Sequence, residues 1–271
     1  MGRLDDRIAI VTGASRGIGA AIAKRIAEEG ATVAVAARSE QQVDERLPGT
    51  IHTVVHEIED AGGRALAVPT DMSKEEDRAR LVETVARELG PPDILVNNAA
   101  VTFFVPTTEF TRKRYDLMFE VQVWGAVDLA RRVLPYMTEK KRGSILNISS
   151  KAAFHPQGPP YDARFSLATV YGMCKAALER FSTGLASEVY EHGISVNALS
   201  PSKVVPTPGV LFHGLISADS PDAEPVEVMA EAALTLVSGD PNELTGRICF
   251  SQELLDEFGI EAPRSRAEAT R

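Results

Sequence analysis

The chain has 271 residues, and its fractions of hydrophobic (44%) and charged (25%) residues are those of an ordinary globular protein long enough to bury a substantial core. Its formal charge of −9 argues against a surface that binds nucleic acid or an anionic membrane. No apolar run approaches the roughly 20 residues that cross a bilayer, so no membrane span is expected.

The N-terminus and the cysteines bear on the compartment. The first residues enter a strand without the apolar core of a signal peptide. Cys174 and Cys249 are too few for a disulfide framework and lack the spacing of metal ligands, so no metal site is expected. We therefore expect a reduced, cytoplasmic protein.

Apolar runs typical of strands alternate with stretches typical of helices. Strands are expected at residues 7–11, 31–37, 65–69, 94–96, 144–149, 194–199 and 247–250. Helices are expected at residues 20–29, 50–61, 74–89, 112–136 and 170–191. The alternation has no linker-like break, which predicts a single α/β domain over residues 1–260, with a doubly wound parallel sheet of about seven strands and helices on both faces. Residues 261–271 are polar and are expected to form a disordered tail.

A glycine-rich turn, Thr-Gly-Ala-Ser-Arg-Gly-Ile-Gly over residues 12–19, follows the first strand and opens the first helix. Glycines there let the backbone approach a pyrophosphate, and the helix N-terminus attracts its charge. Gly13, Gly17 and Gly19 are spaced Gly-x-x-x-Gly-x-Gly, unlike the commonest dinucleotide fingerprint. An ordinary tight turn is the alternative, but the strand before and the helix after favour nucleotide binding.

Two tyrosine–lysine pairs have the four-residue spacing that places both side chains on one helix face, Tyr171 with Lys175 and Tyr136 with Lys140. A nearby ammonium lowers the pKa of a phenol from its usual value of about 10, and such a pair can exchange a proton with an alcohol or carbonyl oxygen. Lys140 belongs to a charged C-terminal turn and is expected to be solvated. Spacing alone does not choose between the pairs.

Six motifs along the chain separate the two pairs. They are the glycine turn, Asp71, Asn97-Asn-Ala99, Asn147-Ile-Ser-Ser150, Tyr171-x-x-x-Lys175 and Asn197-Ala-Leu-Ser-Pro201. Together, over about residues 5–250, they resemble the short-chain dehydrogenase/reductase family, which has the Rossmann fold. Residues 47–63 are longer than in most members and resemble the hydroxysteroid-dehydrogenase-like branch.

The resemblance implies a set of catalytic roles. Ser150 would steady the substrate oxygen, Tyr171 would give or take the proton, and Lys175 would lower the pKa of the tyrosine and bind the nicotinamide ribose. Gln122 stands where the family has an asparagine that completes a water-linked proton relay. Ser149 is the rival of Ser150, but alternation along a strand places the two on opposite faces.

The resemblance also implies an NADP(H) site. Where NAD-specific members have a carboxylate at the end of the second strand, this chain has Ala37 followed by Arg38, and Arg16 lies in the glycine turn. Two guanidiniums suit a 2′-phosphate, whereas two solvated arginines beside NAD(H) are the alternative. The residues expected at the cofactor are Gly13, Ser15, Arg16, Gly17, Ile18, Gly19, Arg38, Asp71, Met72, Asn98, Ala99, Ala100, Tyr171, Lys175, Pro201, Ser202 and Val204.

The chain departs from the family pattern at several places. Ala100 and Ser202 stand where glycine is usual, and residues 151–170 are longer than usual. This segment is interpreted as a substrate-gripping loop, with a surface insertion or an oligomer contact as the alternatives. His155 within it could assist proton transfer or be an ordinary surface residue. Residues 212–214, including His213, are expected to lead into a lid, and Phe103 and Phe104 could face the substrate or belong to the core.

The sequence therefore predicts an NADP-preferring oxidoreductase that interconverts a secondary alcohol and a ketone, with an apolar substrate. One alternative is a nucleotide-binding sensor or scaffold with impaired turnover. Another is a reductase of carbon–carbon double bonds in thioester substrates, whose tyrosine and lysine are usually further apart. The long helices over residues 112–136 and 170–191 suggest a homodimer or homotetramer, as in the family.

Overall fold

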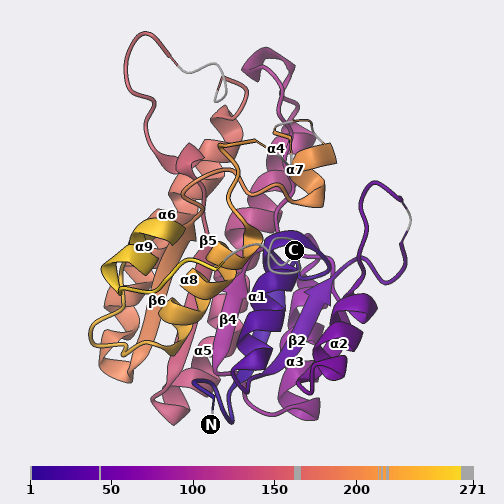
Figure 1. The fold of residues 1–271 in the computed structure, drawn as a ribbon, viewed down its shortest axis with the longest axis vertical. Coiled ribbons are helices and arrows are strands. Elements are labelled where there is room, and N and C mark those ends of the chain that lie inside the picture. Colours follow the sequence, from indigo (N-terminus) through magenta and orange to yellow (C-terminus); the bar gives the residue numbers. More distant parts are fainter. Residues whose placement is uncertain are drawn as a thin grey trace.

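The computed structural model describes residues 2–42, 44–161, 166–212, 214, 216–217 and 220–263 (Figure 1). The tail from residue 264, Phe165 and His213 lie outside this range, so the expectations for them stay predictions. The packed chain continues slightly beyond the expected domain end at residue 260, because Ala262 still packs against the core. No helix in the described ranges is long and apolar enough to cross a membrane.

A single sheet of seven parallel strands forms the centre of the molecule, in the order β3-β2-β1-β4-β5-β6-β7 (Figure 1). The inner strands are buried on both faces, which explains their near-continuous apolar runs. The order reverses between β1 and β4, and ligands of such sheets bind beside that point at the carboxyl ends of the strands. The strands are β1 Ile8–Thr12, β2 Thr32–Ala37, β3 Arg64–Pro69, β4 Ile94–Asn97, β5 Gly143–Ile148, β6 Ile194–Ser200 and β7 Ile248–Phe250.

Helices cover both faces of the sheet, as the sequence predicted. The core on one face contains buried residues of α1, α2, α8 and α9, and the core on the other face contains those of α3, α5 and α6. The helices are α1 Gly17–Glu28, α2 Ile51–Asp60, α3 Glu75–Glu88, α4 Arg112–Phe119, α5 Gly125–Lys140, α6 Thr169–Val189, α7 Pro208–Phe212, α8 Val226–Ser238 and α9 Ser251–Glu257.

Local sequence signals set several helix ends. The Thr50 hydroxyl accepts a hydrogen bond from the Thr53 amide at 3.0 Å and caps the start of α2. Helix α3 opens with three acidic residues, 75–77, which complement the positive end of its dipole. Lys141 ends α5 in the left-handed conformation.

The helix expected over residues 112–136 is interrupted. It consists of α4, a π-helical turn η2 at Glu120–Trp124, and α5, which runs on to Lys140. A π-turn adds one residue to a helical turn and is frequent at functional sites. Helices α8 and α9 were not among the sequence expectations. Helix α8 is buried along nearly its whole length, so it shows none of the polar and apolar alternation of a surface helix.

Candidate active site

The residues expected at the cofactor and at the reaction centre gather at one end of the sheet. The glycine turn follows β1, Arg38 follows β2, Asp71 follows β3, residues 98–100 follow β4, and Ser150 follows β5. Pro201, Ser202 and Val204 follow β6, while Tyr171 and Lys175 lie near the start of α6 and Gln122 lies in η2. Parallel strands bring all of these segments to the carboxyl edge, where the switch point lies.

The glycine turn is packed directly against the residues that follow β4. Gly13 has a φ of 64°, and a Cβ there would lie 2.8 Å from the Ala99 Cα, so a side chain is excluded. The Asn98 Nδ2 donates to the Thr12 carbonyl at 2.9 Å, and the Thr12 Oγ1 accepts the amides of Asn98 and Ala99. A Cβ at Gly19 would lie 2.4 Å from the Asn98 Nδ2. Asn98 therefore braces the turn that would face a pyrophosphate.

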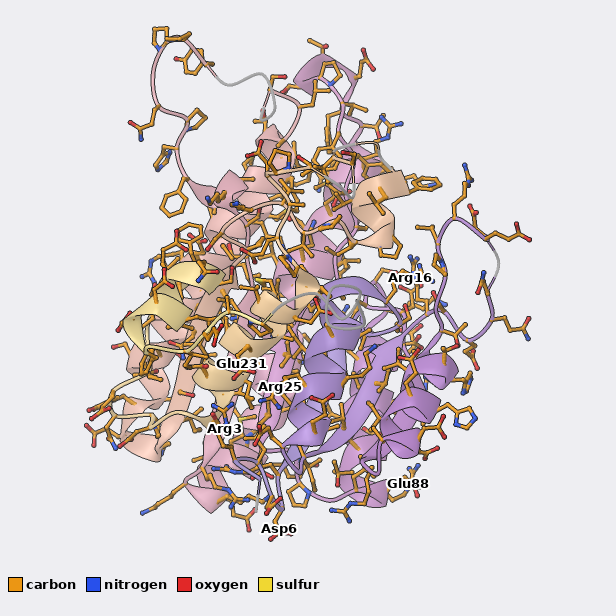
Figure 2. All side chains as sticks on the ribbon, in the orientation of Figure 1. Arg3, Asp6, Arg16, Arg25, Glu88 and Glu231 are labelled. Atoms are coloured by element: carbon orange, nitrogen blue, oxygen red, sulfur yellow. The ribbon has the colours of Figure 1, made fainter. Side chains whose placement is uncertain are left out.

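Arg16 lies above the end of β2, at the edge of the sheet opposite Asp6 and Glu88 (Figure 2). Its Nη2 donates to the Ser39 Oγ at 3.2 Å and to the Gly49 carbonyl at 2.9 Å, which ties the glycine turn to the loop after β2. Burial and the charge of Arg38 both lower the pKa of Arg16. The two guanidiniums are therefore close enough to repel each other, and an anion between them would relieve that repulsion.

The two serines at the end of β5 have different partners. The Ser149 Oγ donates to the Glu179 Oε1 at 2.6 Å and is buried. The Ser150 Oγ accepts the Ala152 amide at 3.2 Å and lies near enough to the Tyr171 phenol to act against the rise of its pKa. Strand alternation predicted this separation, and it leaves Ser150 beside the tyrosine.

Tyr171 and Lys175 share one face of α6, and burial shifts the pKa of both groups. Burial raises the pKa of Tyr171 and outweighs the Ser150 hydrogen bond. The Lys175 Nζ instead donates to the Ile148 carbonyl at 2.8 Å and lies 5.5 Å from the centre of the Tyr171 ring. Burial also lowers the pKa of Lys175 to about 8. Burial therefore dominates the pKa of both groups, and the expectation that Lys175 lowers the pKa of Tyr171 stays a prediction.

Glu179 is a further ionisable residue of this site that the sequence reading missed. It lies one turn beyond Lys175 on the same face of α6 and is buried. Burial raises its pKa, although the Ser149 hydrogen bond and the charge of Lys175 oppose the rise. The repeated four-residue spacing from Tyr171 through Lys175 to Glu179 was the signal that could have revealed it.

Gln122 is buried in η2, and its Nε2 donates to the Val101 carbonyl at 2.8 Å. Its Oε1 is buried and has no hydrogen-bond partner among the described residues. The glutamine amide group thus donates to the segment after β4, and its oxygen is left without a described hydrogen-bond partner inside the protein.

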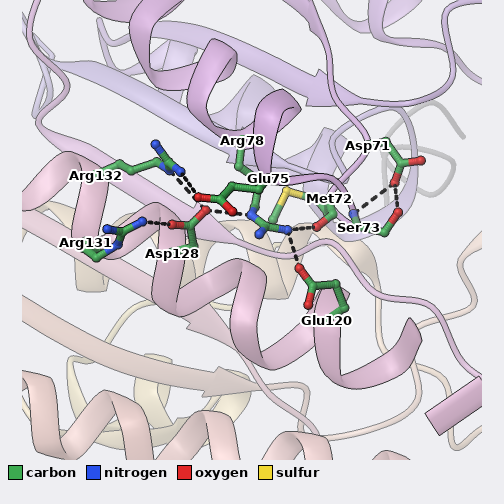
Figure 3. Close-up of polar contacts among 9 residues, drawn as sticks. All are labelled: Asp71, Met72, Ser73, Glu75, Arg78, Glu120, Asp128, Arg131 and Arg132. Atoms are coloured by element: carbon green, nitrogen blue, oxygen red, sulfur yellow. Dashed lines mark hydrogen bonds and ion pairs between the residues drawn. The ribbon is translucent and has the colours of Figure 1, made fainter. Parts of the chain in front are cut away.

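Asp71 and Met72 form a tight turn after β3. The Asp71 Oδ1 accepts from the amide and the hydroxyl of Ser73 (Figure 3). The Asp71 amide donates to the Asp77 Oδ2 at 2.8 Å. Met72 is buried, whereas Ala100, after β4, is exposed. The turn is therefore rigid where the resemblance places the adenine.

Ser202 does not offer its side chain to a ligand. The Ser202 Oγ donates to a Glu253 carboxylate oxygen and accepts the Gln252 amide, while its own amide donates to the Ser251 Oγ at 2.9 Å. Its hydroxyl is thus bonded to α9, which leaves only its backbone for the expected cofactor contact. Val204 is 40% exposed and pairs with Ala223.

The described part of the long insertion is exposed. After the short 3-10 helix η3 at Lys151–Ala153, all residues from 154 to 161, including His155, are exposed, and the segment projects from the carboxyl edge of the sheet (Figure 1). Phe154 stacks on Phe250 with ring centres 5.5 Å apart. Phe104, after β4, packs edge-on against Tyr171, with ring centres 6.0 Å apart. Phe103 lies against Arg114, 5.3 Å from its guanidinium.

The second tyrosine–lysine pair lies elsewhere. Tyr136 packs against the core, and the Lys140 Nζ bonds the Pro91 carbonyl at 2.9 Å and the Asp93 Oδ1 at 3.2 Å. Asp93 immediately precedes β4, so this pair is at the amino edge of the sheet. The expectation that Lys140 is simply solvated is wrong, because Asp93 binds it.

Comparisons with known proteins agree with this architecture. A family model described as short chain dehydrogenase matches residues 7–210. The chain is 36% identical over 260 residues to hydroxysteroid dehydrogenase-like protein 2 of Xenopus tropicalis, a match that covers 96% of this chain and 60% of that protein. The chain thus spans about three fifths of the length of such curated relatives.

Solved structures show the same fold. A short chain dehydrogenase from Mycobacterium thermoresistibile is 33% identical with a TM-score of 0.82, covering 95% of this chain and 89% of that one. L-sorbose reductase from Gluconobacter frateurii, complexed with NADPH and L-sorbose, is 29% identical with a TM-score of 0.77, covering 91% of this chain and 95% of that one. The fold, the motifs and the family match together place this chain in the short-chain dehydrogenase family of oxidoreductases, close to the hydroxysteroid-dehydrogenase-like branch.

Proposed function

We propose that the chain is an NADP-preferring oxidoreductase that interconverts a secondary alcohol and a ketone. The observation that carries the proposal is the group formed by Ser150, Tyr171 and Lys175, in which Ser150 lies near enough to the phenol to affect its pKa and the lysine is buried one turn away. A bound nicotinamide would supply or take the hydride, which no side chain can do. The protein groups would hold the substrate oxygen and move its proton.

The direction of proton transfer follows from the environment of Tyr171. Its pKa is raised, so the phenol is protonated near neutral pH and is ready to give its proton to a carbonyl oxygen. Ser150 would hold that oxygen by a second hydrogen bond. In the reverse direction Tyr171 must first lose its proton. A charged Lys175 assists the phenolate that forms, and its pKa of about 8 makes this help weaken as the pH rises.

The cofactor assignment rests on the glycine turn and the paired arginines. The turn leaves no room for side chains at Gly13 and Gly19, which fits a backbone that meets a pyrophosphate closely. Arg16 and Arg38 supply two positive charges at the end of β2 with no carboxylate there, which favours a 2′-phosphate. That the related L-sorbose reductase binds NADPH supports this choice.

An apolar substrate suits the surroundings of Tyr171. Its ring packs with a cluster built on Met118, Val170 and Cys174, and Phe104 meets it edge-on.

The chain would further form a homodimer through the outer faces of α5 and α6. A groove of about 690 Å³ there is lined by apolar residues such as Leu134 and Phe181 and by the charged residues Arg131, Glu139 and Glu188. These opposite charges would pair across a two-fold axis.

A nucleotide-binding sensor with impaired turnover is the second candidate, and Gln122 is the observation that favours it. Its amide nitrogen is bonded to Val101 and its oxygen is unmatched among the described residues, so a proton relay through this residue would have to be rebuilt when ligands bind.

A substrate panel separates the two candidates. Purified protein is mixed with NADPH or NADH and with aliphatic, aromatic and steroid ketones, while cofactor oxidation and cofactor fluorescence are recorded. We expect NADPH binding and reduction of at least one ketone, and about 10²- to 10⁴-fold slower turnover by Tyr171→Phe with cofactor binding retained. Binding of NADPH without turnover of any ketone would favour the sensor.

A further inference from the structure

Arg78, on the inner side of α3, is a buried guanidinium that bonds three segments at once. Only 1% of its side chain is exposed. Its Nη1 donates to the Met72 carbonyl at 2.6 Å and to the Glu120 Oε1 at 2.8 Å, and its Nε donates to the Asp128 Oδ2 at 2.8 Å (Figure 3). The acceptors come from the turn after β3, from η2 and from α5. Two of the three acceptors, Glu120 and Asp128, lie 42 and 50 residues beyond Arg78 in the sequence.

Asp128 balances the charge of Arg78. Besides Arg78, it accepts hydrogen bonds from Arg131 at 2.6 Å and Arg132 at 3.1 Å. Burial alone would raise the pKa of Asp128, but these three guanidiniums outweigh it and lower the pKa to about 2. The carboxylate therefore stays charged at neutral pH, and Arg78 keeps a buried counter-ion.

Stability is a poor explanation for such a cluster. Two buried charges are costly to remove from water, and replacing a buried ion pair with apolar residues of similar size is often neutral or stabilising. A buried ion pair does fix geometry, because its hydrogen bonds are directional and breaking one leaves a charge unpaired. The role of Arg78 therefore depends on the atoms whose positions it fixes.

One fixed atom is the Met72 carbonyl, at the proposed adenine site. The Asp71–Ser73 turn is already restrained by its own side-chain bonds, and Arg78 anchors it from below. The Met72 side chain also lies beside the start of α5, since a Cβ at Gly125 would lie 3.0 Å from the Met72 Cε. The position of this turn therefore depends on the helix that follows η2.

The other fixed group is Glu120, the first residue of η2. Gln122 lies two residues further in the same π-turn, where its Nε2 bonds Val101 and its Oε1 is buried without a described partner. A π-turn has less regular hydrogen bonding than an α-helix and needs support from outside the helix. Arg78 supplies such support through Glu120.

We propose that Arg78 is a positioning residue that holds the proposed adenine turn and the π-turn of Gln122 in one arrangement. The proposal rests on the proposed function, because it assigns a cofactor to this edge of the sheet and a place near the proton path to Gln122. It assigns Arg78 no contact with substrate or cofactor. Loss of Arg78 would displace both the proposed adenine turn and the π-turn of Gln122, whereas loss of Glu120 would displace only the π-turn.

Four variants test the proposal with NADPH and a ketone that the unmodified protein reduces. Arg78→Leu with Asp128→Leu removes both buried charges together, and the charged partners that remain are partly exposed, namely Glu120, Arg131 and Arg132. Arg78→Lys keeps the charge. Glu120→Ala breaks only the bond to η2. Arg132→Met is the matched control, because Arg132 bonds Asp128 and Glu75 but neither Met72 nor Glu120. The measurements are KM for NADPH, kcat, NADPH affinity by fluorescence, and Tm.

The double variant is expected to raise KM for NADPH and lower kcat, each by about tenfold, with Arg78→Lys between it and the unmodified protein. Glu120→Ala is expected to lower kcat by about fivefold with KM for NADPH unchanged, and Arg132→Met to leave both within about twofold.

Equal kinetic constants for the double variant and Arg132→Met, with only Tm lowered, would overturn the proposal and leave Arg78 a brace between α3 and α5. If the double variant does not fold, Glu120→Ala decides alone, because the Glu120 side chain is 37% exposed and its loss is tolerated by the fold. An unchanged kcat there overturns the proposal. Failure of the unmodified protein to bind NADPH or reduce any ketone would instead overturn the proposed function, and this proposal with it.

Discussion

The two tyrosine–lysine pairs of this chain have the same spacing and opposite surroundings. Lys140 is 28% exposed at the amino edge of the sheet and is paired with Asp93. Lys175 is buried at the carboxyl edge, bonded to a backbone carbonyl, with its pKa lowered to about 8. The four-residue spacing places both side chains on one helix face, whereas burial and neighbouring groups decide whether the pair can move a proton near neutral pH.

Replacing each lysine by methionine should reveal the largest difference between the two pairs, which is in turnover. Lys175→Met is expected to lower turnover by about 10²-fold or more, because the charge beside the Tyr171 phenolate is lost, whereas Lys140→Met should leave turnover within about twofold. Steady-state kinetics with NADPH and a reducible ketone measure both. Equal losses in the two variants would contradict the assignment of the reaction centre to α6.

The same two variants should have opposite effects on stability. The pKa of Lys175 is about 8 in the folded protein and 10.5 in the unfolded chain, so folding is disfavoured by this group below pH 8, and stability rises as the pH goes from 8 to 10.5. Lys175→Met should therefore gain up to about 3 kcal/mol of unfolding free energy at pH 7. Lys140→Met loses its bond to Asp93 and should be slightly less stable. Urea denaturation at pH 7 and pH 10 checks both, and a less stable Lys175→Met would contradict the account.

Much of the fold could be predicted from the sequence because it follows from local patterns of residues. Seven short apolar runs, five of them followed by an expected helix or a glycine turn, predicted the parallel sheet, and every strand was found within about two residues of its expected bounds. The π-turn was not readable, since residues 120–124 fit a helical pattern whether or not one residue bulges. Helix α8 was missed because a helix buried all round carries no amphipathic signal.

The site was predictable only where the motif itself determines the geometry. The glycine turn, Ser150 and Tyr171 lie where the motifs placed them, at the carboxyl edge. The partners of Ser202 on α9 and the bond between Arg78 and Asp128 join residues about 50 positions apart, and no local pattern encodes such contacts. The raised pKa of Tyr171 likewise depends on burial, which tertiary packing decides.

The nucleotide end of the site offers a further test. Arg38→Asp should shift the preference from NADPH toward NADH by about tenfold or more in kcat/KM, because a carboxylate repels a 2′-phosphate and accepts the ribose hydroxyls of NAD. Arg64→Asp, at the exposed start of β3, is the control for a charge change at a distance from the carboxyl edge. An unchanged preference in Arg38→Asp would remove the support for NADP.

Glu179 should tune Lys175 rather than carry the proton. Its charge raises the pKa of Lys175, so Glu179→Gln should lower that pKa further and move the basic limb of the pH–rate profile to lower pH. Glu191→Gln, at an exposed position after the end of α6, should leave the profile unchanged. Rates from pH 5 to 10 measure the effect, and coincident profiles of all three proteins would exclude this role.

The smallest expected effect concerns Asp128 and is seen only in acid. Its pKa is 3.8 in an unfolded chain and about 2 in the folded protein, so its contribution is present above pH 4 and is lost as the pH falls toward 2. The difference corresponds to about 2 kcal/mol of unfolding free energy. Asp128→Asn should lack this part of the acid dependence. Equal slopes of stability against pH below 4 in the two proteins would contradict it.

The most direct test of the central claim compares Tyr171→Phe with Tyr136→Phe. Each substitution removes one hydroxyl from a partly buried tyrosine that has a lysine four residues later. Single-turnover reduction of a ketone and NADPH binding are measured on the same samples. We predict that Tyr171→Phe binds NADPH normally and loses turnover, while Tyr136→Phe retains both. Retained turnover in Tyr171→Phe would contradict it.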